Sequence, residues 1–257
     1  MAYSWRGRLG LLLPAVNTTM ERDFWRLAPE GVTVHATRFD SGHEGSAENL
    51  RGMAGSAVGA ARLLAYTRPA VAVFGCTSGS FVDGIDGNAE MEDELSRELG
   101  CPTLTTSTAM LEALRVVGAQ RVGVLTPYVE ETNVRLGAYI AASGIAVAEV
   151  RGLGVLDMFE HAQISRDDIY EAAMGFSGMA IDALFIACTQ LQITDDIETL
   201  ERDLGIPVIG AVQCSLWAAL RRIGKGLPIE GAGSLLRVPV GTSPGQIVEP
   251  RNLISAR

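Results

Sequence analysis

Two cysteines occupy matched positions in the chain, and each follows a short run of buried-type residues. The segment Ala72-Val-Phe-Gly-Cys76-Thr77 resembles Leu184-Phe-Ile-Ala-Cys188-Thr189, and the two cysteines are 112 residues apart. A thiolate is a nucleophile and a base, whereas a thiol donates a proton, so a facing pair supports covalent or acid–base chemistry. A lone cysteine at a strand end is usually a small core residue. The matched positions favour a catalytic pair instead.

Small hydroxyl-bearing residues follow both cysteines. Thr77 and Ser78 come after Cys76, and Thr189 comes after Cys188. A turn from a strand into a helix presents backbone N–H groups and hydroxyls to an anion, and a carboxylate is the natural guest. The same N–H groups can lower the pKa of a thiol from its usual value of about 8.5. We therefore expect Thr77, Ser78 and Thr189 to bind substrate beside ionisable cysteines.

Asn17 and Tyr128 follow the first strands of the two matched segments, in Pro14-Ala-Val-Asn17 and Thr126-Pro-Tyr128. Each has a purely structural alternative. Asn17 could cap a helix, and Tyr128 could be a core aromatic whose hydroxyl finds a partner. We predict that both bind substrate, Asn17 by donating to a carboxylate.

These residues must be positioned by a duplicated α/β unit. Arg8-Leu-Gly-Leu-Leu-Leu-Pro14 resembles Arg121-Val-Gly-Val-Leu-Thr-Pro127, and Arg97-Glu-Leu-Gly resembles Arg202-Asp-Leu-Gly. Continuous apolar runs predict buried parallel strands. The predicted strands are 9–13, 32–36, 70–74, 103–104, 122–125, 146–150, 183–186 and 208–209. Helical patterns occupy 47–66, 87–99, 106–117, 130–143, 165–175, 195–204 and 213–223.

We predict two pseudo-symmetric lobes, each a parallel sheet flanked by helices, with the site in the cleft between them. Residues 1–115 and 215–257 would form the N-terminal lobe, which carries Cys76, and residues 116–214 the C-terminal lobe, which carries Cys188. Ligands of open α/β sheets bind at the carboxyl ends of the strands, where both cysteines are placed.

Composition excludes several classes of protein. The net charge is -9, with no basic face that nucleic-acid binding would require. The apolar run 9–16 is short and interrupted by Pro14, so we predict a buried strand and no membrane segment. Without an export signal, we expect a cytoplasmic protein with reduced thiols. The histidines His35, His43 and His161 lack metal-ligand spacing, and no nucleotide-binding motif is present, so neither a metal nor a cofactor is expected.

The motifs around Asn17, Cys76, Tyr128 and Cys188 resemble the Asp/Glu racemase superfamily over about residues 8 to 237. Within it, the chain is most similar to the maleate cis-trans isomerases and the arylmalonate decarboxylases. The resemblance implies the Asp/Glu racemase-like fold, a small carboxylic or dicarboxylic acid as substrate, no cofactor and a homo-oligomer. It also implies that the cysteine equivalent to Cys76 attacks a double bond and that the one equivalent to Cys188 is the acid.

The resemblance is divided between the two branches. The paired cysteines and Asn17 match the isomerases, which carry an Asn where this chain has Met158. Thr77, Ser78 and Tyr128 match the decarboxylases, which have Gly at the position of Cys76 and apolar residues near Met158. We predict a two-cysteine isomerase of a small acid, and we place Met158 in the substrate-binding set. A decarboxylase, an amino-acid or hydantoin-type racemase, and a non-catalytic binding protein for a small acid remain alternatives.

Overall fold

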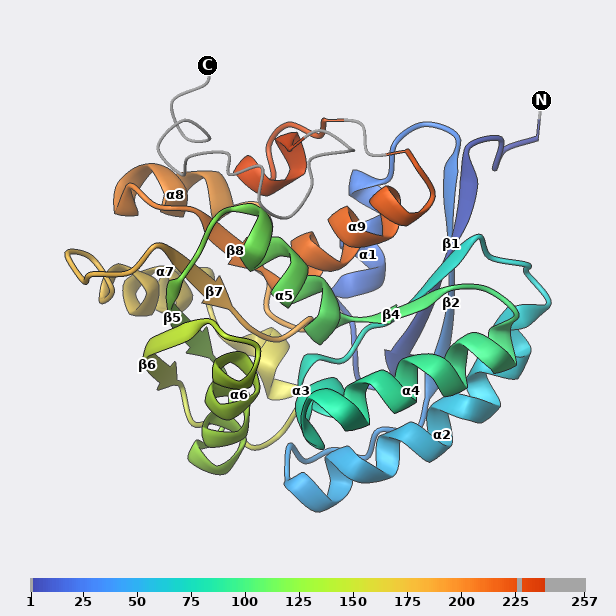
Figure 1. Cartoon of the computed structure of the whole chain (residues 1–257), viewed down its shortest axis with the longest axis horizontal. Helices are drawn as coiled ribbons and strands as arrows, with labels where there is room; N and C mark the ends of the chain where they lie inside the picture. Colours follow the sequence, from blue (N-terminus) through green and yellow to red (C-terminus); the bar gives the residue numbers. More distant parts are fainter. Residues whose placement is uncertain (1, 226–227, 239–257) are drawn as a thin grey trace.

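The computed structural model describes residues 2–225 and 228–238 (Figure 1). The elements of the first half are β1 (Gly7–Pro14), α1 (Met20–Leu27), β2 (Val32–Phe39), α2 (Ala47–Ala65), β3 (Val71–Phe74), α3 (Thr77–Phe81), α4 (Gly84–Leu99), β4 (Thr103–Thr105) and α5 (Thr106–Val116). Those that follow are β5 (Arg121–Thr126), α6 (Glu130–Ala142), β6 (Ala146–Gly152), η1 (Glu160–Gln163), α7 (Arg166–Met174), β7 (Ala183–Ile186), α8 (Ile197–Leu204), β8 (Val208–Gly210), α9 (Ala211–Arg222) and η2 (Ser234–Arg237).

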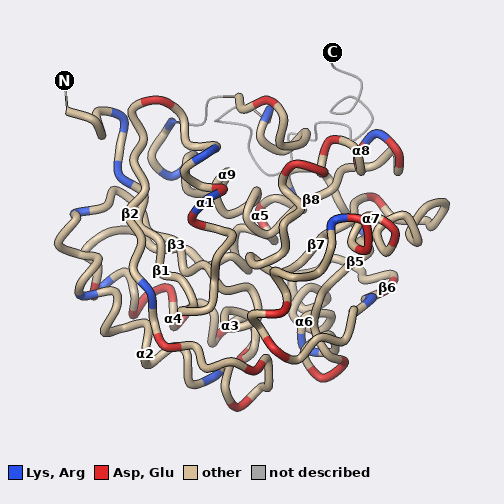
Figure 2. Tube along the Cα trace, turned by 180° about the vertical axis from the view of Figure 1, so that it is seen from behind, with Lys and Arg blue, Asp and Glu red and all other residues tan. Residues whose placement is uncertain are grey.

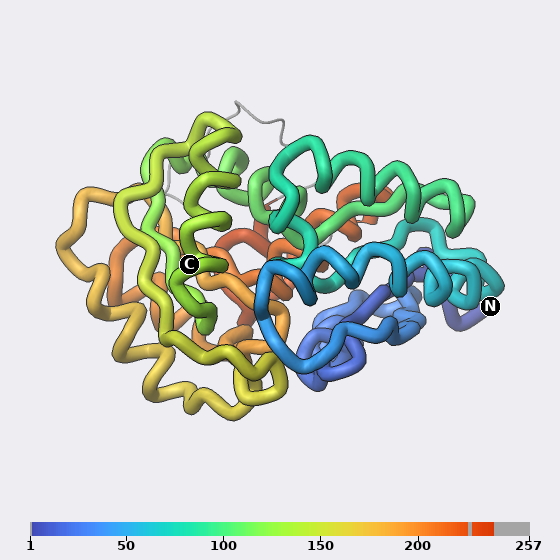
Figure 3. The backbone as a smooth tube through the Cα atoms, turned by 90° about the horizontal axis from the view of Figure 1, so that it is seen from below, coloured from blue at the N-terminus to red at the C-terminus, as the bar shows by residue number. Residues whose placement is uncertain are grey.

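The strands form two parallel sheets with the same topology. Their orders are β2-β1-β3-β4 and β6-β5-β7-β8, so each strand of the first sheet has a counterpart in the second. The two halves of the chain lie side by side (Figure 3). All eight predicted strands are present, and the predicted fold class is confirmed.

Alternating side chains of β1 show why these sheets are covered on both faces. Leu9, Leu11 and Leu13 enter a core that also takes in residues of the second half, whereas Leu12 enters a separate cluster with Phe74. Side chains of a strand alternate between its faces, so an uninterrupted apolar run buries both. The matching cluster on the second sheet includes Leu125 and Ile186.

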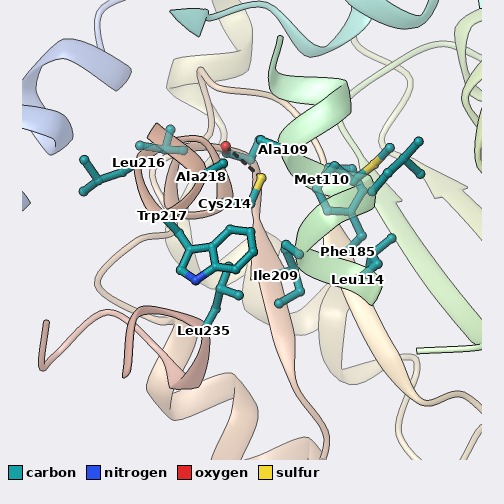
Figure 4. Close-up of a cluster of buried hydrophobic side chains, with 14 of the residues drawn as sticks. Ala109, Met110, Leu114, Phe185, Ile209, Cys214, Leu216, Trp217, Ala218 and Leu235 are labelled. Carbon is teal, nitrogen blue, oxygen red and sulfur yellow. Dashed lines mark hydrogen bonds between the residues drawn. The ribbon is translucent and has the colours of Figure 1, made fainter. Parts of the chain in front are cut away.

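Helices α5 and α9 join the two halves. Met110 and Leu114 of α5 lie beside Phe185 of β7 and Ile209 of β8 (Figure 4). Helix α9 follows β8 in the chain but also contacts β3 and α1. The lobe boundaries at 115 and 215 stay a prediction, and residues 1, 226–227 and 239–257 of the predicted N-terminal lobe lie outside the described residues.

Helix ends repeat as well. The matched Leu-Gly pairs end α4 and α8, where Gly100 and Gly205 adopt φ of 67° and 70°. Glycine takes this left-handed conformation without the steric cost of a side chain. Ser165 caps α7 by accepting the Asp168 N–H at 3.1 Å.

Two α-helices of the described residues were missed by the sequence analysis. Helix α1 is only 8 residues long, although its buried residues Met20, Phe24 and Leu27 have helical spacing. Helix α3 has 5 residues, which is too short for a periodic pattern, and it begins where Cys76 accepts the N–H of Gly79. Both follow strands that end near the predicted site.

Acidic and basic residues are interspersed along the described Cα trace (Figure 2). None of the helices in residues 2–225 and 228–238 combines the length and the apolar character needed to cross a bilayer.

Candidate active site

The two sheets bring Cys76 and Cys188 to one cavity. It contains about 330 Å³ of space not filled by atoms, part of which is open to solvent. All eight predicted site residues line it: Asn17, Cys76, Thr77, Ser78, Tyr128, Met158, Cys188 and Thr189. Pro14, Val16, His161 and Gln190 complete the lining. The structure thus places the predicted residues together, while their roles stay predictions.

Cys76 lies at the N-terminus of α3 and is almost fully buried. Its Sγ accepts the Gly79 N–H at 3.4 Å and lies 3.8 Å from both Ser78 Oγ and Met53 Sδ. Burial raises the pKa of the Cys76 thiol, and the Gly79 N–H and the Ser78 hydroxyl partly offset this effect. These two donors would stabilise a thiolate once it forms.

Cys188 has an unusual backbone conformation, with φ of 84°. A side chain in this region is strained and is held there only by its surroundings. The Gln190 N–H donates to Cys188 Sγ at 3.4 Å, and His161 Nδ1 lies 3.6 Å from the same sulfur. Burial, with a further contribution from Cys76, raises the pKa of Cys188 to about 12.

The expected lowering of the thiol pKa is therefore wrong for this site. Backbone N–H groups do reach both sulfurs, at 3.4 Å in each case. Desolvation disfavours the charged form of a buried thiol, and here it outweighs those hydrogen bonds. In the free site both cysteines are therefore protonated thiols at neutral pH.

Tyr128 and Thr77 place two hydroxyls in the same cavity. Burial raises the pKa of Tyr128 well above its usual value, so the phenol keeps its proton and can donate it. Thr77 Oγ1 is buried without a hydrogen bond of ordinary geometry, although it lies near enough to Tyr128 to affect that pKa. A buried hydroxyl that lacks a good hydrogen-bond partner in the free protein is suited to bind a polar ligand.

Asn17 both caps a helix and faces the cavity. Its Oδ1 accepts the N–H groups of Thr19 and Met20, at 3.1 and 3.0 Å. Its Nδ2 donates to Thr189 Oγ1 at 3.1 Å, and Thr189 Oγ1 donates to the Gly75 carbonyl at 2.9 Å. An amide nitrogen has two hydrogens, so one remains for a ligand. The two functions weighed for Asn17 are therefore compatible.

Gln190 ties the loop after β1 to the loop after β7. Its Oε1 accepts the Thr18 N–H at 2.8 Å, and its Nε2 donates to the Val16 carbonyl at 2.8 Å. Its own carbonyl accepts the Thr19 hydroxyl at 2.9 Å. These contacts hold Asn17 and Thr189 at the junction of the two sheets.

Met158 reaches the cavity from the other side. It belongs to the second half of the chain, yet it packs in the apolar cluster of the first sheet. Its N–H donates to the His43 carbonyl at 2.8 Å, and the Gly45 N–H donates to the Leu156 carbonyl at 3.0 Å. Two long loops thus pair across the halves and place an apolar wall on the cavity.

Gln190 and His161 are the polar lining residues that the sequence analysis did not select. Gln190 directly follows Thr189, so its position was a usable signal. His161 lies in η1, in the connection between β6 and α7, and only the three-dimensional path of that connection brings it to Cys188. Among the described residues no cluster of three or more His, Cys, Asp or Glu is placed to hold a metal ion.

The duplicated fold and the cavity between its sheets define a class of two-lobed α/β enzymes, and comparison with known proteins gives the family. Residues 9–236 match the arylmalonate decarboxylase family, and the chain belongs to it. The chain is also 30% identical to a maleate isomerase of Nocardia farcinica, over 90% of this chain and 95% of that protein. It is 29% identical to an arylmalonate decarboxylase of Bordetella bronchiseptica, over 85% of this chain and 91% of that protein.

A solved structure shows the same fold with a covalent intermediate. It is a Cys-to-Ser mutant of the Nocardia farcinica maleate cis-trans isomerase with a covalently bound succinylcysteine intermediate. The TM-score is 0.85 at 28% identity, and the alignment covers 90% of this chain and 98% of that one. The resemblance predicted from the sequence motifs is confirmed for both branches.

Proposed function

We propose that this chain is a cofactor-independent isomerase that converts a small cis-unsaturated dicarboxylic acid, such as maleate, into its trans isomer. The observation that carries the proposal is the pair of cysteines at equivalent strand ends in one cavity. A succinylcysteine in a relative of the same fold supports covalent chemistry at one of them. The two thiols have the distinct environments that a nucleophile and an acid require.

The proposed reaction begins with addition of the Cys76 thiolate to one carbon of the double bond. The neighbouring carbon takes the Cys188 proton, and the former double bond becomes a single bond that can rotate. The Cys188 thiolate then takes a proton back from that carbon, the carbon–sulfur bond breaks, and the trans alkene leaves with both cysteines restored. Cys188, with a pKa of about 12, suits the acid because it keeps its proton at neutral pH.

The remaining lining residues would hold the two carboxylates. Electron density that moves onto a carboxylate during addition is stabilised by donors already aimed at it. We assign this function to the hydroxyls of Thr77, Ser78 and Tyr128. The second Nδ2 hydrogen of Asn17 would bind the other carboxylate beside Thr189, and Met158 would close the apolar side.

The test is to incubate the purified protein with maleate in heavy water and to follow fumarate by NMR. Cys76→Ala and Cys188→Ala should each lower the rate by at least about 10²-fold, the usual contribution of a positioned proton donor or acceptor. Cys101→Ala is the matched control, because Cys101 is also unpaired but does not line the cavity. Absence of fumarate with the intact protein would exclude maleate as the substrate.

A decarboxylase is the second candidate, and the buried Met158 favours it. An apolar wall would destabilise one carboxylate of an arylmalonate, and Cys188 alone would return a proton to the carbon that loses carbon dioxide. In that case phenylmalonate would release carbon dioxide, Cys76→Ala would keep the activity, and Cys188→Ala would lose it. A racemase would instead need both cysteines for deuterium exchange at an α-carbon. A binding protein would turn over none of these acids.

We also propose that the protein works in the cytoplasm as a homo-oligomer. A site that needs two free thiols suits the reducing cytoplasm, and all four cysteines are free. The family resemblance implies a homo-oligomer, and size-exclusion chromatography with light scattering would test it.

A further inference from the structure

His161 is held in one tautomer by the backbone. Its Nε2 lies 3.0 Å from the Val155 carbonyl, which can only accept, so Nε2 carries the hydrogen. Its Nδ1 lies 3.6 Å from Cys188 Sγ. A neutral imidazole with a hydrogen on Nε2 has a lone pair on Nδ1 and therefore accepts the Cys188 S–H. In the free site that proton points at the ring, which is the wrong direction for an acid that must reach a substrate carbon.

Within the described residues, the cavity proposed to bind a dicarboxylate is not lined by a permanent cation. Its described lining contains no Lys or Arg, and His161 is the one lining side chain that can become positively charged. The titratable groups around the ring are Cys188 at Nδ1, Tyr128 with its ring centroid 5.8 Å away, and the exposed Asp157. Burial lowers the pKa of His161, and Asp157 opposes that effect, so the free ring is neutral near pH 7.

We propose that binding of the dicarboxylate substrate protonates His161 and reverses its hydrogen bond to Cys188. The ring needs no movement, because Nε2 already donates to Val155 and only Nδ1 gains a hydrogen. The new Nδ1–H donates to Cys188 Sγ, and the S–H is released to turn toward the substrate. His161 is thus a positioning residue: it frees the Cys188 S–H to point toward the substrate only when an anion fills the cavity. The inference rests on the proposed isomerase function.

The protons of the proposed reaction then balance within the site. Cys76 must lose one proton before it attacks, and His161 gains one, so the occupied cavity holds as many protons as the free one. When Cys188 gives its proton to carbon, the resulting thiolate lies beside an imidazolium and not beside a neutral ring. Return of the proton from carbon restores the thiol, and product release restores the imidazole.

The test is NMR of the histidine rings with succinate as the probe, because this saturated dicarboxylate cannot be isomerised. The chain has three histidines, so loss of one ring signal in His161→Gln assigns His161. Long-range proton–nitrogen correlations should show hydrogen on Nε2 alone in the free protein and on both nitrogens with succinate at pH 7. The titration midpoint of His161 should rise by about two pH units, as an anion roughly 6 Å away at an effective dielectric of about 20 requires. His35, which lies on β2, should not respond.

Each contrary result has a separate meaning. If Nδ1 carries the hydrogen in the free protein, the argument from tautomer geometry is overturned whatever binds. If succinate inhibits maleate turnover but leaves His161 neutral, the inference fails and the proposed function stands. If neither succinate nor maleate binds, the proposed function fails and takes the inference with it. In kinetics, His161→Gln should lower kcat more than it raises KM and should shift the pH profile, whereas His35→Gln should leave both unchanged.

Discussion

Replacing Thr189 by valine should loosen the junction between the two sheets. The Thr189 hydroxyl is buried, accepts from Asn17 Nδ2 at 3.1 Å and donates to the Gly75 carbonyl at 2.9 Å. Valine keeps the shape but leaves both partners without a hydrogen bond. Each buried group left unpaired costs about 1–3 kcal/mol, so two such groups should lower the free energy of unfolding by about 2–6 kcal/mol. For a chain of this size the melting temperature should fall by about 4–24 °C.

Thr189→Ser is the matched control, because it keeps the hydroxyl and loses one methyl group, at a cost of about 1 kcal/mol. Urea unfolding of the three proteins gives the free energies, and maleate turnover gives the effect of an unanchored Asn17 amide. Thr189→Val should raise KM as well as lower stability. If it unfolds within about 0.5 kcal/mol of the unaltered protein, well below the cost of two unpaired groups, the hydroxyl does not hold the junction and our account of it is wrong.

Three further predictions concern the cavity. Gly75→Ala would place a methyl group 2.6 Å from Met20 Sδ, so it should lower both the melting temperature and the rate of turnover. Calorimetry and the fumarate assay measure these two effects, and an unchanged melting temperature would contradict the packing around Gly75. Because the pKa of Cys188 is about 12, the rate at which iodoacetamide alkylates this thiol should rise about tenfold per pH unit from pH 8 to pH 10. Peptide mass spectrometry would measure this rate, and a plateau by pH 9 would refute the raised pKa. Met158→Asn adds a carboxylate-binding amide to the apolar wall. The kcat/KM for maleate should therefore rise by about tenfold, which corresponds to the free energy of one hydrogen bond to a charged group. A fall in kcat/KM would show that the site requires an apolar wall.

The strands were predictable because each is a short apolar run covered on both faces, as Leu9 to Leu13 show. The repeat of these runs in the sequence also predicted that Cys76 and Cys188 lie at equivalent strand ends. Helix α3 was not predictable, because one turn has no periodicity and begins at the thiol of Cys76 itself.

The contact between Cys188 and His161 could not be predicted from the sequence, for a different reason. It depends on the path of the loop after β6, which is held by backbone contacts such as that between Met158 and His43. No local pattern in the sequence encodes a contact between two loops from different halves. The direction of the thiol pKa was missed for a related reason, because burial is set by the whole fold, whereas the N–H groups near Cys76 are local.

The central claim is that Cys76 forms a covalent bond to the substrate while Cys188 supplies the proton. The most direct test is to treat Cys188→Ser with maleate and to locate any adduct by intact-mass and peptide mass spectrometry. We predict a mass increase of one maleate, confined to the peptide that carries Cys76 and absent from the double variant Cys76→Ala, Cys188→Ser. An unmodified Cys76, in a protein that still converts maleate when Cys188 is present, would contradict the mechanism.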